Sequence, residues 1–565
     1  MKNYYLKRLK NINNTMMLKN IFLILVLATS IPVKAQLHGS LETNATRYVD
    51  DNKIKLEEIE AMNRFRSNNY LRLDYTYKQF SAGVQLESYQ PKALLNYAPK
   101  LTGTNLGSYY LNYHNRKIGL DLTAGHFYEQ FGNGLVFRTW EDRQLGIANS
   151  IAGGRIKFTP QEAINITALY GKQRNGLGFD FTKGTILGLN TELDISSLLK
   201  FNETVIGVGA SFVNRNYKES NLIGVNENTY LTSIRGSIKE AGFFADIEYA
   251  FKTKDALVEF NSIRPDLQFD GDAYLLNLGY SRKGFGINTS LRRLENFGFY
   301  SQRDLHGNAY NQGSLNYIPA LTKQYDYGLT NIYVYAAQPN ISFEPNRNKA
   351  GEIGGQIDLY YNFKKGSLIG GKYGTNIALN YAQWNGLHGI YDAENRKYKA
   401  YFPGFGQKYY RDGSIELRKK WDNKWSTVIT YLNQYYNTRY VEEAVGEVNA
   451  NTLVLDQSLQ LGIKSIRLEL QHQWADSNFK NWLATQLEFN FNGNWSVFGL
   501  DLYNYGNDLE AKKIHYYNFG GTYKKGATRI QTSYGRQRGG LICVGGVCRF
   551  VPESVGLNVG INFSF

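Results

Sequence analysis

Apolar and polar residues alternate along most of this chain, and the pattern is clearest in its last twelve residues, 554–565. Every second residue there is apolar, namely Val555, Leu557, Val559, Ile561, Phe563 and Phe565, and the residues between them are Ser, Gly or Asn. Successive side chains of a β-strand point to opposite faces, so the stretch predicts a strand with one apolar and one polar face. A soluble antiparallel sheet can show the same alternation. About ten such residues without a charge on the apolar face favour a strand that crosses a bilayer.

The same alternation recurs from Leu37 onward and predicts about 24 strands, within a range of roughly 22 to 26. A first strand at 37–48 and a last strand at 554–565 enclose a series of hairpins. These span 71–87, 106–126, 153–172, 183–214, 229–252, 272–295, 353–383, 412–436, 451–474, 482–503 and 513–536. Several turn on a glycine, as at Ala241-Gly242 and Asn492-Gly493, because tight hairpin turns need positive φ angles.

Short and long connections alternate between these strands. The long ones are 48–66, 90–105, 127–151, 296–352, 384–411 and 537–552. If the mature chain begins in the periplasm, every short turn lies there and every long loop lies outside, as is typical of bacterial barrels. The sequence therefore predicts an all-β fold: a large transmembrane antiparallel β-barrel with short periplasmic turns and long extracellular loops. A propeller or tandem sandwich would repeat about every forty residues, and we find no such repeat.

The first 35 residues have the pattern of a signal peptide. Five basic residues precede an apolar run at 21–31, and Val33-Lys34-Ala35 offers the small residues that signal peptidase reads. We therefore expect cleavage before Gln36 and two regions, the signal peptide 1–35 and the barrel 36–565. The expected location is the cell outer membrane, with its lipid as the first partner.

Composition narrows the function. Removing residues 1–35 removes six basic residues and no acidic one, which lowers the formal charge from +15 to +9. The remaining Lys and Arg are spread over strands and loops, whereas a nucleic-acid site would cluster them, so we expect no nucleic-acid partner. The 44 Tyr, 31 Phe and 7 Trp suit the aromatic girdles of a barrel.

Polar residues are densest between His126 and Arg174. We expect part of this segment to fold into the lumen as a charge cluster, composed of Glu129, Arg138, Glu141, Arg143 and Arg155. We expect Arg138, Glu141, Arg143 and Arg155 to pair with each other or with lumen-facing charges. On the predicted strands at 243–249 and 466–471, charges of both signs share the polar face. Opposite charges on neighbouring strands stabilise each other, so for these residues pairing within the wall is favoured over substrate binding.

Several motifs resemble a known family. The segments F-Y-E-Q-F-G-x-G-L, R-x-x-E-x-R, G-I-x-N-S, G-G-R and A-L-Y-G-x-Q-R, with the later C-V-G-G-V-C-R, resemble a Bacteroidota outer-membrane β-barrel family catalogued as a domain of unknown function. The resemblance implies location and fold and transfers no catalytic residue. The closing strand also resembles those of bacterial outer-membrane proteins, which implies that Phe563 and Phe565 form an assembly signal for the barrel-assembly machinery.

Cys543 and Cys548 are the only cysteines. In an exported chain, two cysteines around Val544-Gly545-Gly546-Val547 favour a disulfide across a tight loop. A metal held by two thiolates would need further ligands nearby, and none is evident. We expect the bridge to pin the outer loop that precedes the closing strand.

The sequence shows no catalytic motif. Neither G-x-S-x-G nor H-E-x-x-H occurs, the seven histidines are scattered, and Asp270-Gly271-Asp272 lacks the spaced ligands of a calcium loop. A Ser-His pair formed across strands would not be visible in one sequence. We expect no enzyme activity, no metal and no cofactor.

Two functions fit these expectations. A barrel of about 24 strands would be wider than an open porin, so the segments 296–352 and 127–151 are expected to fill it. Such a barrel would serve as a structural or accessory subunit of an outer-membrane assembly, secretion or uptake complex, together with other outer-membrane proteins. The alternative is a porin-like channel for small solutes. A TonB-type transporter is disfavoured because strands begin at Leu37, which leaves no room for a plug domain ahead of the barrel.

Overall fold

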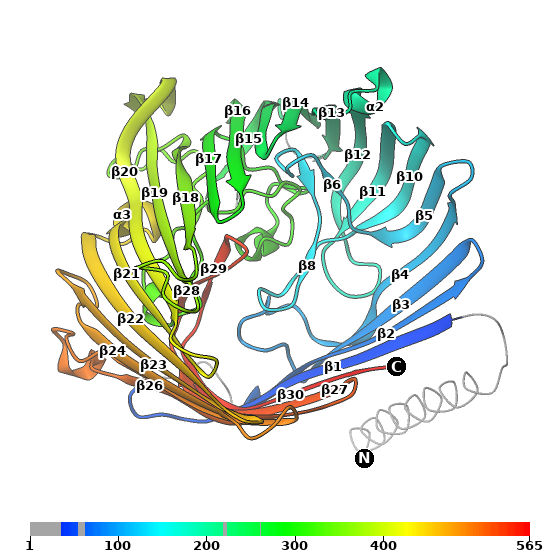
Figure 1. Cartoon of the computed structure of the whole chain (residues 1–565). Helices are drawn as coiled ribbons and strands as arrows, with labels where there is room; N and C mark the ends of the chain where they lie inside the picture. Colours follow the sequence, from blue (N-terminus) through cyan, green and yellow to red (C-terminus); the bar gives the residue numbers. More distant parts are fainter. Residues whose placement is uncertain (1–35, 55–62, 219–222, 260–261) are drawn as a thin grey trace, which may run out of the picture.

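The computed structural model describes residues 36–54, 63–218, 223–259 and 262–565. Twenty-four strands form one antiparallel sheet, in which neighbours in sequence pair with each other. Strand β1 (Gln36–Tyr48) also pairs with β30 (Ser554–Ser564), so the sheet closes on itself (Figure 1). The predicted large antiparallel barrel of about 24 strands is confirmed. The predicted signal peptide, 1–35, lies outside the described residues.

The wall strands between β1 and β30 follow the chain. They are β2 (Phe65–Tyr77), β3 (Phe80–Gln90), β4 (Gly103–Asn115), β5 (Leu120–Phe127), β10 (Ile151–Gln161), β11 (Ile164–Arg174), β12 (Phe181–Asp194), β13 (Val205–Asn216), β14 (Asn228–Glu240), β15 (Phe243–Glu259), β16 (Ser262–Arg282), β17 (Phe285–Glu295), β18 (Gly351–Phe363), β19 (Thr375–Asp392), β20 (Lys397–Lys420), β21 (Trp425–Asn437), β22 (Glu447–Leu461), β23 (Lys464–Ala475), β24 (Trp482–Asn490), β25 (Trp495–Tyr503), β26 (His515–Lys525) and β27 (Thr528–Gln537).

Short elements occupy some of the connections. They are the strands β6 (Gln130–Phe131), β7 (Phe137–Arg138), β8 (Glu141–Asp142), β9 (Ile147–Ala148), β28 (Gly540–Val544) and β29 (Val547–Val551), with the helices α2 (Ile195–Leu199), α3 (Thr438–Val441), η2 (His306–Tyr310), η3 (Leu329–Asn331) and η4 (Glu510–Lys512). Among the described residues, no helix has the length and apolar character to cross a membrane.

The alternation in the sequence corresponds to the two faces of the wall. Leu41, Leu71 and Phe563 lie at paired positions of β1, β2 and β30. Large apolar side chains are exposed on the outward face of nearly every wall strand, for example Leu111, Ile156, Leu189, Ile234, Leu291, Leu379, Leu453, Leu487 and Phe519. Such an outward apolar surface is what a barrel embedded in lipid requires.

The two ends of the barrel differ, as predicted. At one end, here called the turn end, β2–β3, β14–β15 and β26–β27 are joined by two residues each, and both chain ends of the sheet lie there. At Ala241-Gly242 both φ angles are positive, 46° and 85°, which suits a tight hairpin turn. At the opposite end, here called the loop end, connections such as 128–150 and 296–350 are long.

One predicted loop is wrong. Residues 384–411 were expected to form an outer loop, but β19 and β20 continue as a paired hairpin whose turn is only 393–396. Register shifts interrupt the pairing between Trp384 and Gly389, which broke the alternation on which the prediction depended. In this extension β20 pairs with β19 alone, and a strand with a free edge tolerates a proline such as Pro403.

Candidate functional site

Three loop-end connections fold into the barrel and are here called the plug: residues 128–150, 296–350 and 538–553. Figure 1 shows β6, β8, β28 and β29 within the ring of wall strands. The predicted lumen segments 127–151 and 296–352 therefore lie inside, together with a third segment that was not predicted to do so.

The first plug core joins the segment after β5 to the wall. Its members from the plug are Phe131, Leu135, Val136, Phe137, Phe297, Phe299 and Leu315, and those from the wall include Ile151, Ile186, Val213, Leu231, Ala250, Ala273 and Leu294. Most of these side chains are fully buried. Each fully buried Leu or Phe contributes roughly 1.5–3 kcal/mol through the loss of its exposed surface, so this core holds the plug firmly.

A second plug core is rich in aromatic rings. Tyr335 of the plug stacks between the rings of Trp384 and Tyr410 on the wall, with centroid distances of 5.8 and 5.4 Å. The same core includes Leu329, Ile332 and Tyr333 of the plug, Leu541 of β28, and Tyr436 and Trp482 of the wall. The two cores pack the plug against the wall in the loop half of the lumen.

Wall carboxylates fasten the plug by hydrogen bonds. Glu352 accepts from Tyr335 Oη at 2.5 Å and from the backbone amide of Gln338 at 2.6 Å, while Arg292 Nη2 donates to its other oxygen at 2.7 Å. Glu248 accepts from the backbone amide of Asn133 at 3.1 Å. Because these carboxylates are buried, the loss of a plug contact would leave one of their oxygens without that hydrogen bond.

The predicted charge cluster separates into two groups. Arg143 forms ion pairs with Glu141 at 2.9 Å and with Glu42 of β1. Arg155 binds Asp121 and Glu129, at 3.1 and 3.2 Å. Burial lowers the pKa of Arg143, but the two carboxylates outweigh this and raise it overall.

The expected pairing of Arg138 is wrong. Its guanidinium lies over the ring of Tyr317, 3.8 Å from the centroid, and among the described residues it forms no ion pair. Its backbone amide donates to Leu315, which places the side chain against aromatic rings of the plug instead of carboxylates.

Other buried ion pairs were missed by the sequence analysis. Arg174 makes two hydrogen bonds to Glu87, at 2.8 and 2.7 Å, and both side chains are almost fully buried. Asp255 is shared by Arg215 and Arg303. Glu87, Arg174, Arg215 and Asp255 lie near the loop ends of wall strands, and Arg303 lies in the plug. No local pattern in the sequence marks these residues as partners.

Cys543 and Cys548 form a disulfide across the hairpin β28–β29. This hairpin belongs to the plug: the amide of Ala320 donates to Gly546 at 2.7 Å and Tyr317 Oη donates to Gly545 at 2.6 Å. The bridge was expected to pin an outer loop, and it closes a loop that packs inside the barrel.

Arg549, directly after the disulfide, is buried, and its three guanidinium nitrogens have no hydrogen-bond partner among the described residues. The rings of Tyr97 and Tyr310 lie 5.8 and 5.9 Å from it. Burial is the main cause that lowers its pKa to about 10.

The last strand brings its aromatic residues to the turn end. Phe565 and Gly39 of β1 exchange backbone hydrogen bonds at 2.9 Å. The ring of Phe565 covers Gly39 so closely that a Cβ there would lie 2.2 Å from it, which explains the glycine. Phe563 and Phe565 are both exposed on the barrel surface.

The turn half of the lumen is polar and accessible. Arg418 faces inward beside Glu416, and its side chain is 61% exposed although its Nε lies 2.5 Å from that carboxylate. Glu192 and Lys157 are also substantially exposed, with 40% each. The barrel therefore resembles a cup that holds the plug in its loop half and is open at its turn end.

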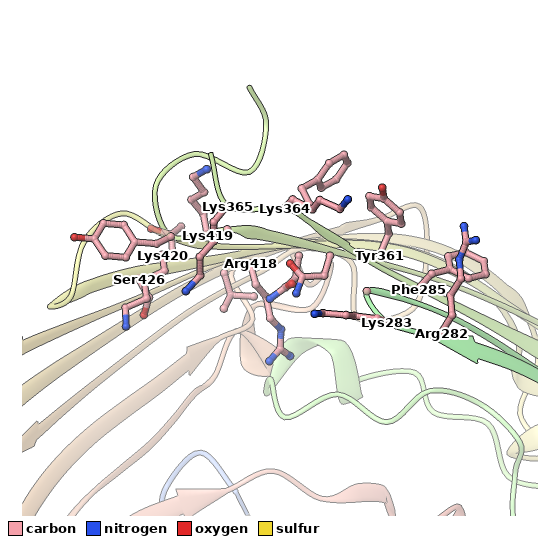
Figure 2. A pocket seen from close by; sticks show the side chains of 18 residues that line it. Arg282, Lys283, Phe285, Tyr361, Lys364, Lys365, Arg418, Lys419, Lys420 and Ser426 are labelled. Atoms are coloured by element: carbon pink, nitrogen blue, oxygen red, sulfur yellow. The ribbon is translucent and has the colours of Figure 1, made fainter. Parts of the chain in front are cut away.

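A cleft of about 1120 Å³, here called the rim cleft, lies at the turn end between the connections β16–β17, β18–β19 and β20–β21. It is lined by Arg282, Lys283, Lys364, Lys365, Arg418, Lys419 and Lys420, with aromatic residues such as Phe285, Tyr361, Phe363 and Tyr373. Figure 2 shows Arg418 on the opposite side of the strands from Tyr361 and Lys364.

No group of three or more His, Cys, Asp or Glu suited to a metal ion occurs among the described residues.

A model described as a family of unknown function (DUF6029) matches residues 14–565. No curated protein matches the chain.

Solved structures of barrels resemble it at low identity. The translocation pore of the P pilus usher PapC is 9% identical, with 94% of this chain and 99% of that chain covered and a TM-score of 0.36. The siderophore receptor PirA from Pseudomonas aeruginosa is 9% identical, with 94% and 80% covered and a TM-score of 0.39. A BenF-like porin from Pseudomonas fluorescens Pf-5 is 8% identical, with 94% and 98% covered and a TM-score of 0.35.

Proposed function

We propose that this chain, which belongs to the DUF6029 family of unknown function, is an outer-membrane β-barrel closed by its own plug. It would act as a structural or accessory subunit of an outer-membrane assembly, secretion or uptake complex. The observation that carries the proposal is the pair of buried plug cores in the loop half of the lumen.

The plug makes steady conduction unfavourable. An ion that crosses an apolar core loses its hydration without gaining a partner, which costs far more than thermal energy. Opening a path would also break the contacts of Glu352 with Tyr335 and Gln338 and leave a buried carboxylate without them.

The two ends suggest an orientation. Short turns face the periplasm in bacterial barrels and long loops face outward. The open cup and the rim cleft would then face the periplasm, where a soluble or membrane-bound partner can reach them.

Planar bilayer recordings test the closed lumen. The purified protein should conduct little or erratically. Replacing residues 298–348 by a short Gly-Ser linker should open it, and the barrel can accept this change because the amide of Asn296 already donates to Ala350 at 2.7 Å. A band that shifts between boiled and unboiled gels would show that both proteins are folded barrels.

A large, steady conductance from the unmodified protein would favour the porin-like alternative instead. The accessory role is tested separately by purification from membranes in mild detergent. Other outer-membrane proteins should copurify in fixed ratio with the wild-type protein, and purification of the barrel alone would contradict the role as a subunit.

A further inference from the structure

The rim cleft is unusually cationic. Seven of its eighteen lining residues are Lys or Arg and none is Asp or Glu, whereas Lys and Arg make up 64 of 565 residues in the chain. Like charges gathered in one cleft repel each other. An arrangement of this kind is favourable when an anion occupies the space between them.

Four of these seven cations have no polar partner among the described residues. Lys283, Lys364, Lys365 and Lys420 form no ion pair or side-chain hydrogen bond among the described residues. Arg418 alone binds a carboxylate, that of Glu416. Asp422, an acid of the β20–β21 connection, accepts from the backbone amides of Lys424 and Trp425, at 2.6 and 2.8 Å.

The cleft has a fixed wall. Lys419 donates to Thr375 Oγ1 at 2.7 Å and to the carbonyls of Ile369 and Gly370, at 3.0 and 3.1 Å. It thereby ties the 364–374 connection to β20. These contacts of Lys419 therefore fix the position of Lys364 and Lys365 relative to the neighbouring turns.

The cleft lies where a bilayer surface would be. Going toward the turn end of β18, the outward positions are Ile357, Leu359, Tyr361 and Phe363, and then Lys364 and Lys365 follow. Trp421 and Trp425 flank the neighbouring β20–β21 connection, and both rings are exposed. A change from aliphatic to aromatic to cationic side chains marks the depth of lipid headgroups.

We propose that the rim cleft binds the phosphates of an anionic phospholipid in the leaflet at the turn end. Arg418 faces the lumen and Lys419 is bonded to the wall, which leaves five of the seven cations for a ligand. Five cations exceed what one phosphodiester can neutralise, so a lipid with two phosphates, of the cardiolipin type, should bind better than phosphatidylglycerol, which has one. Lys and Arg recognise phosphate by charge-assisted hydrogen bonds, and the adjacent rings accommodate the start of the acyl chains. This inference rests on the proposed membrane location.

Native mass spectrometry of the detergent-purified protein tests the proposal, with cardiolipin, phosphatidylglycerol or phosphatidylethanolamine added to the micelles. The wild-type protein should retain cardiolipin most tightly and phosphatidylethanolamine least. Lys364→Gln/Lys365→Gln should weaken cardiolipin retention at least tenfold. The control Lys524→Gln/Lys525→Gln changes two lysines at another turn-end connection, β26–β27, and should leave retention unchanged.

Equal loss in the control pair, or equal retention of the three lipids, would overturn the proposal. Displacement of cardiolipin by millimolar inorganic phosphate would assign the cleft to free phosphate and also overturn it. An acidic periplasmic protein that binds the wild-type barrel in nanodiscs of phosphatidylethanolamine, and not the Lys364/Lys365 variant, would do the same. Unboiled gels show whether each variant is still a folded barrel. A folded barrel without lipid preference would contradict the lipid site alone and would leave the proposed function unaffected.

Discussion

Buried arginines in this barrel are of two kinds, and the difference has measurable consequences. Arg174 is compensated by two hydrogen bonds to the buried Glu87. Arg549 is equally buried, but among the described residues its guanidinium has no hydrogen-bond partner and lies near the rings of Tyr97 and Tyr310. Cation–π contacts at such distances offset only part of the cost of removing a guanidinium from water.

Replacing Arg549 by Met should therefore stabilise the plug, by about 1 kcal/mol or more, because it removes an uncompensated charge and keeps the packing volume. The same substitution at Arg174 should destabilise the protein by about 3 kcal/mol or more, since it leaves Glu87 buried without its partner. Denaturant unfolding of the two purified variants measures both effects. Destabilisation by Arg549→Met as large as that by Arg174→Met would mean that Arg549 has a partner.

Lys349 should make the plug more stable as the pH rises above about 8. Its ammonium donates to Gln338 at 2.6 Å. Burial, followed by the nearby charge of Arg347, lowers its pKa from 10.5 to about 8. Between these two values the unfolded chain holds the proton and the folded chain does not, so stability rises with pH across this window. Below pH 8 the full cost of burying the ammonium is present.

Hydrogen exchange in 338–350, corrected for the intrinsic rate at each pH, should accordingly slow from pH 7 to pH 9.5. Lys349→Gln keeps a donor without the charge, and its exchange should show no such change. If hydrogen exchange in Lys349→Gln still slows with pH as in the wild-type protein, another titrating group causes the effect.

At the level of elements, most wall strands could be predicted because a residue's face depends only on its neighbours in the chain. The plug could not be predicted in this way. Glu87 and Arg174 are 87 positions apart, and Tyr335 stacks on Trp384 from another segment. Irregular segments have no hydrophobic period from which their direction could be predicted. The charge of Arg138 suggested an ion pair, but its guanidinium lies over Tyr317. No local pattern in 538–553 indicated that this segment folds inward. The register shifts in β19–β20 hid that extension in the same way.

The closing strand offers an element-scale prediction. Phe565 bonds to Gly39 through the backbone and covers it with its ring, next to the seam between β1 and β30. Phe565→Asp places a charge on the lipid-facing side of that seam and should lower the amount of assembled barrel several-fold. The heat-modifiable band in membrane fractions measures this amount. Phe550→Asp, in the plug hairpin, serves as the control and should assemble normally.

The hairpin β28–β29 should be held in place mainly by its hydrogen bonds to the rest of the plug, and less by its disulfide. The bridge closes a loop of six residues, for which the chain-entropy model gives only about 2 kcal/mol. Ala320 and Tyr317 bind the loop carbonyls independently. Cys543→Ser/Cys548→Ser should therefore assemble normally, with faster hydrogen exchange confined to 540–551. Exchange that increases across the whole plug would show that the bridge holds more than its own hairpin.

The molecule as a whole is a cup, and this asymmetry can be tested on one strand. Thr452 and Ser458 both face inward on β22. Thr452 is fully buried and lies beside Gln473, whose amide donates to Leu329 of the plug, whereas Ser458 lies two positions beyond Asp456 toward the turn end and is partly exposed. In detergent both ends of the barrel meet solvent, so only the plug separates the two positions.

Cysteine introduced at each position, in the Cys543→Ser/Cys548→Ser background, should therefore react very differently with a bulky maleimide. Ser458→Cys should label readily and Thr452→Cys at least a hundredfold more slowly, because reaction at Thr452 must await a local opening of the plug. Replacing 298–348 by the Gly-Ser linker removes Leu329 and should bring the two rates together. Similar rates in the intact barrel would mean that water fills the loop half, and the closed cup would then be the wrong description.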